Sequence, residues 1–137
     1  MAELETAVNQ HEQQVRQVIA DYFAATRDMD VEAWLKTMAP EIRSFDPVGT
    51  PPTQGLDAMR KYFAGIAGLC KKIGMTEQSM FVCGNQVAVK WAGQAIGQNG
   101  RSVSFEGIDV FCLNPEGRIQ EILAYWDPQV LLRELQA

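Results

Sequence analysis

Two alternating segments with a short turn between them decide the fold class of this chain: QVAVKWAGQAIG (86–97) and SVSFEGIDVFCL (102–113), joined by QNGR (98–101). In both segments apolar residues recur at every second position, which is the period of a β-strand. Asn99-Gly100 is a strong hairpin signal, because a type I′ turn requires positive φ at both central residues. We therefore expect two long antiparallel strands, Gln86–Gly97 and Ser102–Leu113.

The segments on either side extend this hairpin into an antiparallel meander. Met75–Cys83 and Arg118–Trp126 also alternate with a period of two. Turn-forming residues separate the strands, at Gly84-Asn85 and again at Asn114–Gly117. The second half of the chain is therefore expected to form one four-stranded antiparallel sheet.

The first half of the chain predicts helices. Apolar residues at steps of three and four indicate a helix from about Thr6 to Arg27. Asp30 is a candidate N-cap for a short second helix that ends at Pro40 and turns Trp34, Leu35 and Met38 inward. An extended segment from Ile42 to Val48 and a proline-rich loop then lead to a third helix. Its apolar face comprises Met59, Tyr62, Phe63, Ile66 and Leu69.

This order of elements predicts an α+β fold in which helices pack on a strongly curved antiparallel sheet. Long strands coil as they twist, so the sheet acquires a concave side. Helices grouped before such a sheet cover one of its faces. The result is a cone with an internal pocket, a natural place for a small molecule. The chain shows no repeat and no linker, so residues 1–137 are expected to form a single domain.

Composition excludes several classes of function. With 47% hydrophobic and 21% charged residues and a net charge of −5, the chain has a globular composition that would repel nucleic acid. Its apolar stretches are too short to cross a bilayer, and its acidic start does not resemble a secretory signal. Three cysteines without a close pair indicate reduced thiols and a cytoplasmic location. A single histidine, His11, argues against a metal site.

Three short segments carry a resemblance to a known family: DYFAA (21–25), FDPVG (45–49) and GIDVF (107–111). With them the chain resembles the ketosteroid isomerases, which belong to the nuclear-transport-factor-like and polyketide-cyclase-like superfamily. The resemblance implies that Asp46 is a catalytic base and that Tyr22 and Asp109 donate hydrogen bonds to an oxyanion. It also places Trp126 in an aromatic pocket wall, and it implies a homodimer.

Each of the three site residues also has a structural interpretation. Tyr22 fits the apolar stripe of the first helix, and Asp-Pro is a common turn initiator at Asp46. Asp109 is harder to explain in this way, since it shares strand parity with Phe105 and Phe111. A carboxyl group on an apolar face must be paired, neutral or functional.

The resulting hypothesis is a cofactor-free isomerase that moves a double bond in an enone-type lipid, for example a 3-oxo-Δ5-steroid. Asp46 would shuttle a proton through a dienolate, while Tyr22 and a protonated Asp109 stabilise the oxyanion, as in ketosteroid isomerases. The expected pocket wall, for a small hydrophobic ligand, comprises Met38, Tyr62, Phe63, Phe105, Phe111 and Trp126. A cyclase or hydrolase of the same superfamily, or a non-catalytic ligand-binding or dimerising domain, are the alternatives.

Two further expectations depend on the register of the hairpin. With a two-residue turn at Asn99-Gly100, Lys90 faces Asp109 and holds it ionised, whereas a bulge would turn Lys90 outward. The same register places an apolar patch on the convex face and predicts a homodimer through it. That patch comprises Val87, Val89, Trp91, Ile108, Val110 and Cys112. The alternative is that Val130-Leu131-Leu132 folds back over the patch.

Overall fold

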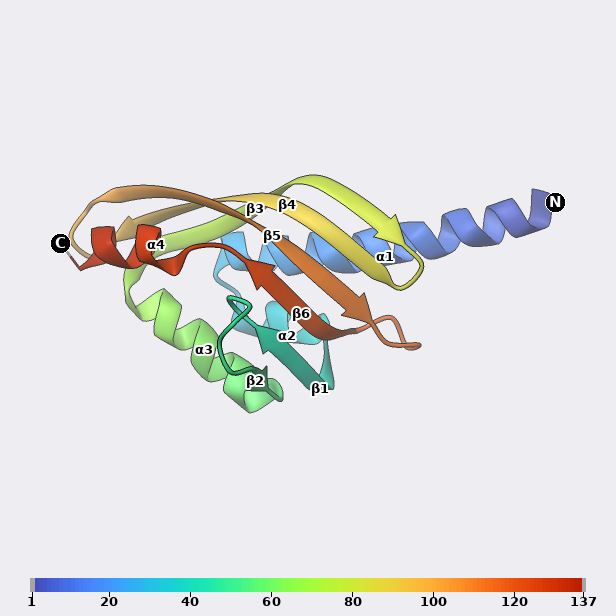
Figure 1. The fold of residues 1–137 in the computed structure, drawn as a ribbon, viewed down its shortest axis with the longest axis horizontal. Helices are drawn as coiled ribbons and strands as arrows, with labels where there is room; N and C mark the ends of the chain where they lie inside the picture. The colour runs from blue at the N-terminus through green and yellow to red at the C-terminus, as the bar shows by residue number, and fades with distance from the viewer. Residues whose placement is uncertain (1, 137) are drawn as a thin grey trace.

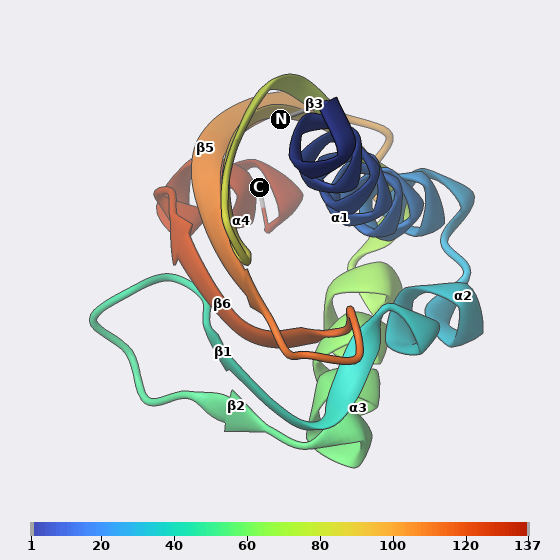
Figure 2. The ribbon, with the colours of Figure 1, turned by 90° about the vertical axis from the view of Figure 1, so that its right-hand side faces the viewer.

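The computed structural model describes residues 2–136, and in them a curved sheet wraps around helices (Figures 1 and 2). The helices are α1 (Ala2–Asp28), α2 (Val31–Lys36), α3 (Leu56–Gly68) and α4 (Pro128–Leu135). The strands are β1 (Met38–Phe45), β2 (Thr53–Gln54), β3 (Cys70–Cys83), β4 (Gln86–Gly97), β5 (Ser102–Leu113) and β6 (Ile119–Tyr125). This α+β cone confirms the predicted fold class, and β4 and β5 have the predicted bounds.

The sheet is mixed rather than purely antiparallel. Its strand order is β2-β1-β6-β5-β4-β3, and β1 runs parallel to β6 while every other neighbouring pair is antiparallel. The parallel pair arises because the chain leaves β1, passes through α3 and the hairpins, and returns beside β1 as β6. Figure 2 shows the sheet as an arc, with α1, α2 and α3 on its concave side.

The second helix is shorter than the sequence predicted. Asp30 does cap it, accepting a hydrogen bond of 3.1 Å from the backbone N–H of Ala33. The helix ends at Lys36, however, and Met38 begins β1. Pro40 therefore lies inside a strand, within the register shift between Met38 and Arg43 on the side of β6. A proline is tolerated there because such an irregularity does not require its missing N–H.

The β4–β5 hairpin has a register one residue away from the predicted one. Its loop has three residues, Gln98 to Gly100, and the backbone N–H of Gly97 donates to the carbonyl of Arg101 over 2.9 Å. Gly100 takes the left-handed conformation, with φ of 82°, that closes three-residue hairpin loops. Val89 therefore pairs with Asp109, and Lys90 pairs with Ile108.

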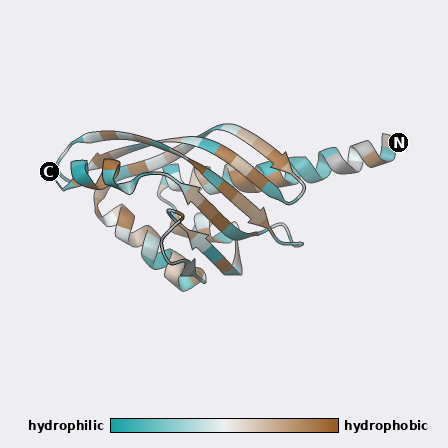
Figure 3. Ribbon diagram, in the orientation of Figure 1, coloured by the Kyte–Doolittle hydropathy of each residue, from teal (hydrophilic) through white to brown (hydrophobic). Residues whose placement is uncertain are grey.

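Because of this one-residue difference in register, half of the predicted convex patch is wrong. Val87, Val89 and Trp91 point into the cone and are at most 2% exposed. Ile108, Val110 and Cys112 remain on the convex face, where they alternate with the buried positions of β5. Figure 3, coloured by hydropathy, shows hydrophobic and hydrophilic segments along the strands of the sheet.

Helix α4 was not expected from the sequence. Asp127 caps it through a 3.0 Å hydrogen bond from the backbone N–H of Gln129, and Pro128 occupies its first turn. Leu131 is 1% exposed and lines the interior of the cone. The C-terminal segment therefore packs on the concave side, and the idea that Val130–Leu132 covers the convex face is wrong. Between residues 2 and 136, no helix combines the length and apolarity needed to span a membrane.

Candidate active site

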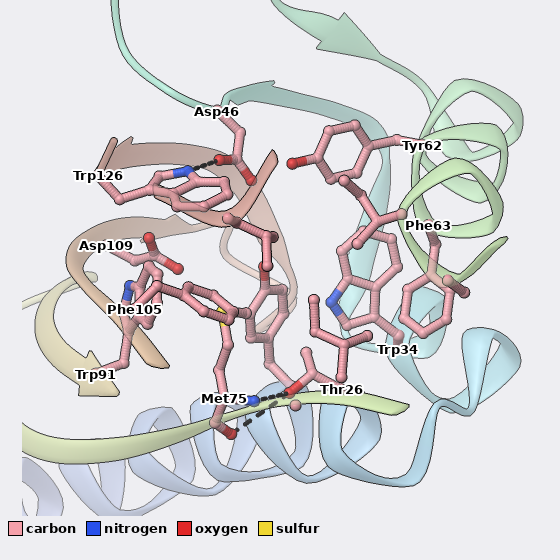
Figure 4. Close-up of a pocket in the computed structure, with 16 residues that line it drawn as sticks. Thr26, Trp34, Asp46, Tyr62, Phe63, Met75, Trp91, Phe105, Asp109 and Trp126 are labelled. Carbon is pink, nitrogen blue, oxygen red and sulfur yellow. Dashed lines mark hydrogen bonds between the residues drawn. The ribbon is translucent and has the colours of Figure 1, made fainter. Parts of the chain in front are cut away.

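A cavity lies between the three N-terminal helices and the concave face of the sheet (Figure 4). Its wall is mostly aromatic and aliphatic, with a few polar groups turned inward. The lining residues are Tyr22, Thr26, Trp34, Asp46, Tyr62, Phe63, Ile66, Ala67, Ile73, Gly74, Met75, Trp91, Phe105, Asp109, Trp126 and Leu131. An apolar wall with few convergent polar groups is typical of a small-molecule site.

The structure brings the three candidate catalytic residues to this one cavity. Tyr22 comes from α1, Asp46 follows the end of β1, and Asp109 lies in β5. The peptide bond between Asp46 and Pro47 is cis. Residues separated by up to 87 positions in the sequence (109 minus 22) therefore face a common space.

The predicted pocket wall is only partly the observed one. Tyr62, Phe63, Phe105 and Trp126 line the cavity, as expected. Met38 and Phe111 lie in the packed core and are not part of its lining, and each is at most 1% exposed. Phe111 instead supports Tyr22 from behind, with ring centroids 5.0 Å apart in an edge-on contact.

Sequence reasoning did not assign Trp34 and Trp91 to the cavity. Trp34 was expected to point inward, but only as a core residue. Trp91 was placed on the opposite face of the sheet. A two-residue turn shifts the register of the hairpin by one residue compared with a three-residue loop, and this shift moves every side chain of β4 to the other face. The available signal was Gly100, which fits the left-handed last position of a three-residue loop as well as the second position of a two-residue turn.

The Asp46 carboxylate is held by two donors in the wall of the cavity. Trp126 Nε1 donates to Asp46 Oδ1 over 2.5 Å, and the Tyr62 hydroxyl is directed at the same carboxylate (Figure 4). Burial raises the pKa of Asp46 above its usual value, and the hydrogen bonds from Trp126 and Tyr62 offset part of that rise. Donors of this kind favour the charged form and orient the carboxylate.

Asp109 has a different environment. Its side chain is 3% exposed, and its Oδ1 atom has no hydrogen-bond partner among the described residues. The Trp91 indole lies beside it, and a hydrogen bond from this indole lowers the pKa of Asp109 by less than burial raises it (Figure 4). Burial, assisted by the negative charge of Asp46, raises the pKa of Asp109 to about 8. At neutral pH Asp109 is therefore mostly a neutral carboxylic acid that can donate a hydrogen bond.

Lys90 does not ionise Asp109. It lies on the convex face, where its Nζ donates to Gln78 Oε1 and to the Trp91 carbonyl, each over 3.1 Å. A weaker ion pair joins it to Glu106 at 3.8 Å. The three-residue loop thus has the effect that a bulge was expected to have.

Tyr22 is held as a neutral phenol. It is 3% exposed and packs against Phe23, Trp34 and Phe111. Burial, with the nearby charges of Asp109 and Asp46, raises its pKa well above the usual value for tyrosine. The phenol therefore keeps its proton and can donate it in a hydrogen bond.

Two glycines make room for the aromatic wall. A Cβ atom on Gly93 would lie 2.3 Å from the ring of Phe105. A Cβ atom on Gly107 would lie 2.6 Å from Trp91 and 2.7 Å from Trp126. Both rings can approach the sheet this closely only because the opposing residue has no side chain. In the described part of the chain, no three His, Cys, Asp or Glu side chains gather as a metal site would require.

Comparison with known proteins supports the fold and a family. The sequence model of the SnoaL-like domain matches residues 19–122. The structure of SalBIII, described as an epoxide hydrolase/cyclase-like enzyme in pyran ring formation in polyether salinomycin, is similar with a TM-score of 0.78 and 28% identity. That match covers 86% of this chain and 94% of SalBIII.

Two further structures share the fold at lower identity. A Δ5-3-ketosteroid isomerase from Mycobacterium sp. has a TM-score of 0.73 and 20% identity, covering 85% of this chain and 95% of its own. A protein from Jannaschia sp. described as a SnoaL-like polyketide cyclase has a TM-score of 0.78 and 17% identity, and the match covers 91% of this chain and 93% of that protein. The cone with an internal cavity is therefore a scaffold shared with isomerases and cyclases.

Proposed function

The chain belongs to the SnoaL-like domain family of the nuclear-transport-factor-like superfamily, and we propose that it is an acid–base enzyme acting on a small apolar carbonyl compound. The observation that supports this proposal is a pair of buried carboxyl groups in one aromatic cavity, of which Asp46 accepts hydrogen bonds while Asp109 Oδ1 accepts none among the described residues. Asp46 accepts hydrogen bonds that favour its charged form, whereas Asp109 is predominantly neutral. Two titratable groups with separated pKa values are suited to the roles of base and acid.

The reaction we propose is the migration of a carbon–carbon double bond into conjugation with a ketone. Asp46 removes a proton from the carbon between the carbonyl and the double bond, and the electron pair moves onto the carbonyl oxygen to give a dienolate. Tyr22 and neutral Asp109 donate hydrogen bonds to that oxygen. Asp46 then returns the same proton to the far carbon of the dienolate, so no other reactant is consumed.

The first test uses a 3-oxo-Δ5-steroid and follows the absorbance of the conjugated product. We expect turnover by the wild-type protein and a loss of at least ~10²-fold in Asp46→Asn, because general acid–base catalysis contributes ~10²–10⁴. Asp57→Asn, an exposed carboxylate of α3, is the matched control and should retain the wild-type rate. An unchanged rate in Asp46→Asn would show that the activity arises elsewhere.

A second candidate function is the opening of an epoxide with ring closure or hydrolysis. It is favoured by the 28% identity to SalBIII and by the presence of a protonated acid opposite a base. Asp109 would give its proton to the epoxide oxygen, while Asp46 takes a proton from the attacking hydroxyl or water. The variant Asp109→Asn separates the two reactions. An amide can still donate a hydrogen bond to a dienolate, but it cannot supply a proton to an epoxide.

We also propose that the chain forms a homodimer through the convex face of the sheet. Three large apolar side chains are exposed on this face: Phe81 by 69%, Ile108 by 44% and Tyr125 by 49%. Ile108 pairs with Tyr125 across β5 and β6, and Phe81 is linked through Ala88 to the half-buried Val110 on the same strand as Ile108. Exposed apolar side chains in one patch are typical of an interface. Sedimentation equilibrium should give twice the 15.3 kDa monomer mass, and Phe81→Glu should give the monomer. A wild-type monomer would refute this assembly.

As part of the same proposal, residues 1–137 act as a single domain. The cysteines Cys70, Cys83 and Cys112 are all unpaired, which fits a reducing compartment such as the cytoplasm. The competing interpretation is a non-catalytic domain that only holds a ligand. Saturable binding without turnover of either a steroid or an epoxide would favour it.

A further inference from the structure

The wall of the cavity includes a purely aliphatic part that the proposed chemistry does not use. Three elements contribute to it, and none of its side chains carries a polar atom. Its members are Ile66 and Ala67 of α3, Ile73 of β3 and Leu131 of α4. We call these four residues the aliphatic collar.

The elements that carry the collar meet at one end of the sheet. Cys70 begins β3 shortly after α3 ends, and it pairs with Gly97, the last residue of β4. The Gln98 side chain donates to the carbonyl of Cys70 over 3.2 Å, and the Asn99 side chain donates to the carbonyl of Glu134 in α4 over 3.0 Å. Figure 1 shows the last turn of α3, the β4–β5 loop and α4 at this end of the molecule.

The oxyanion donor Asp109 lies farther along the sheet. Ile73 pairs with Ala95, which in turn pairs with Val103 of β5. Val103 precedes Asp109 by six residues (109 minus 103), which is roughly 20 Å of strand. A ligand whose carbonyl oxygen lies at Asp109 therefore needs a long apolar part to reach the collar.

The collar is also nearer to solvent than the two oxyanion donors. Ile66, Ala67 and Ile73 are half-buried, whereas Tyr22 and Asp109 are each 3% exposed. Covering such an aliphatic surface with an apolar chain is favourable, because it removes both surfaces from water. The collar offers no hydrogen bond from its side chains, so what it binds must be hydrocarbon.

We propose that the aliphatic collar is a second subsite and that the natural substrate is a carbonyl compound with an aliphatic chain. The carbonyl oxygen lies at Tyr22 and Asp109, and the chain extends through the collar. Ala67 determines specificity here, because its small side chain leaves the space that the chain occupies. The inference rests on the proposed function only for the position of the carbonyl group.

Isothermal titration calorimetry with a series of alkyl phenyl ketones tests this subsite. The probes are acetophenone, butyrophenone, hexanophenone and octanophenone, which share a head group and differ only in the length of the alkyl chain. We expect the wild-type protein to bind octanophenone at least about 50-fold more tightly than acetophenone, because six half-buried methylene groups contribute roughly twofold each. Equal affinities across the series would overturn the inference.

Two variants of the collar identify where the chain binds. Ala67→Leu fills the collar, and Ile66→Asn places an amide in it, so each should reduce the ratio to below about tenfold and leave acetophenone binding unchanged. Ala64→Leu, the same enlargement at an exposed position of α3, is the matched control and should keep the wild-type ratio. A wild-type ratio in both collar variants, or an equal fall in Ala64→Leu, would overturn the inference. Either collar variant suffices if the other does not fold.

The same titration separates this inference from the proposed catalysis. Asp46→Asn lacks the base but keeps the collar, so it should show the wild-type dependence on chain length. A retained dependence together with no turnover of any substrate would refute the catalytic proposal and leave the subsite standing. Equal affinities across the series in a protein that turns over the steroid would do the reverse.

Discussion

Replacing Asp109 by asparagine should remove a pH dependence from the stability of the fold. Burial, with the charge of Asp46, raises the pKa of Asp109 from 3.8 to about 8 in the folded protein. Above the unfolded pKa, the unfolded chain releases a proton that the folded protein retains. This group therefore contributes most stability at low pH, and its contribution falls as the pH rises toward 8.

The magnitude follows from the difference in proton binding. Each pH unit between the two pKa values costs about 1.4 kcal/mol of unfolding free energy. Between pH 5 and pH 8 the wild-type protein should therefore lose about 4 kcal/mol relative to Asp109→Asn, which cannot titrate. The loss should level off above pH 8, where both states are ionised.

Urea unfolding at several pH values between 5 and 9 measures this difference without knowledge of the substrate. The unfolding free energy of the wild type should fall relative to that of Asp109→Asn steadily up to pH 8. Asp57→Asn, a change at an exposed position on α3, should follow the wild-type pH dependence. Parallel curves for the wild type and Asp109→Asn would refute the reasoning and with it the neutral acid.

Three further changes test the site and its support. In Tyr62→Phe the carboxylate of Asp46 loses a donor that lowers its pKa, so the acidic limb of the pH–activity profile should move to higher pH, while the alkaline limb, set by ionisation of Asp109, stays in place. Gly107→Ala introduces a Cβ 2.6 Å from Trp91 and should lower the unfolding free energy by about 1–3 kcal/mol, measured in urea. Gly65→Ala, in α3 with no atom within 4 Å of its Cβ, should instead raise it by roughly 0.5–1 kcal/mol.

The sequence predicted the elements of the fold well where period and turn residues agree. The bounds of β4 and β5 follow from strict alternation, and Asp30 marks the start of α2 by its side-chain chemistry. Met38 was misplaced because a proline at position 40 is as compatible with an irregular strand as with the end of a helix. Helix α4 has eight residues and follows β6 almost directly. Its apolar residues are therefore too few to show a helical period distinct from the alternation of the strand before it.

The candidate site was predictable in its residues but not in its surroundings. Asp109 was identified through the resemblance carried by GIDVF (107–111), and its strand parity supported that choice by placing a carboxyl group on an apolar face. That parity is independent of the partner strand. The facing of Lys90 and Trp91 depended on loop length, and QNG is compatible with loops of two or three residues. A one-residue difference in this loop moved a cation away from Asp109 and brought an indole to it.

All three tryptophans of the chain, Trp34, Trp91 and Trp126, line the same cavity. The intrinsic fluorescence of this protein at wavelengths that excite only indole therefore arises entirely from the wall of this cavity. Trp91 and Trp126, at 6.1 Å, are close enough to exchange excitation energy, so a quencher beside either ring should dim both. A ligand that enters the cone needs no label to be observed, and a candidate compound that leaves the emission unchanged has not entered it.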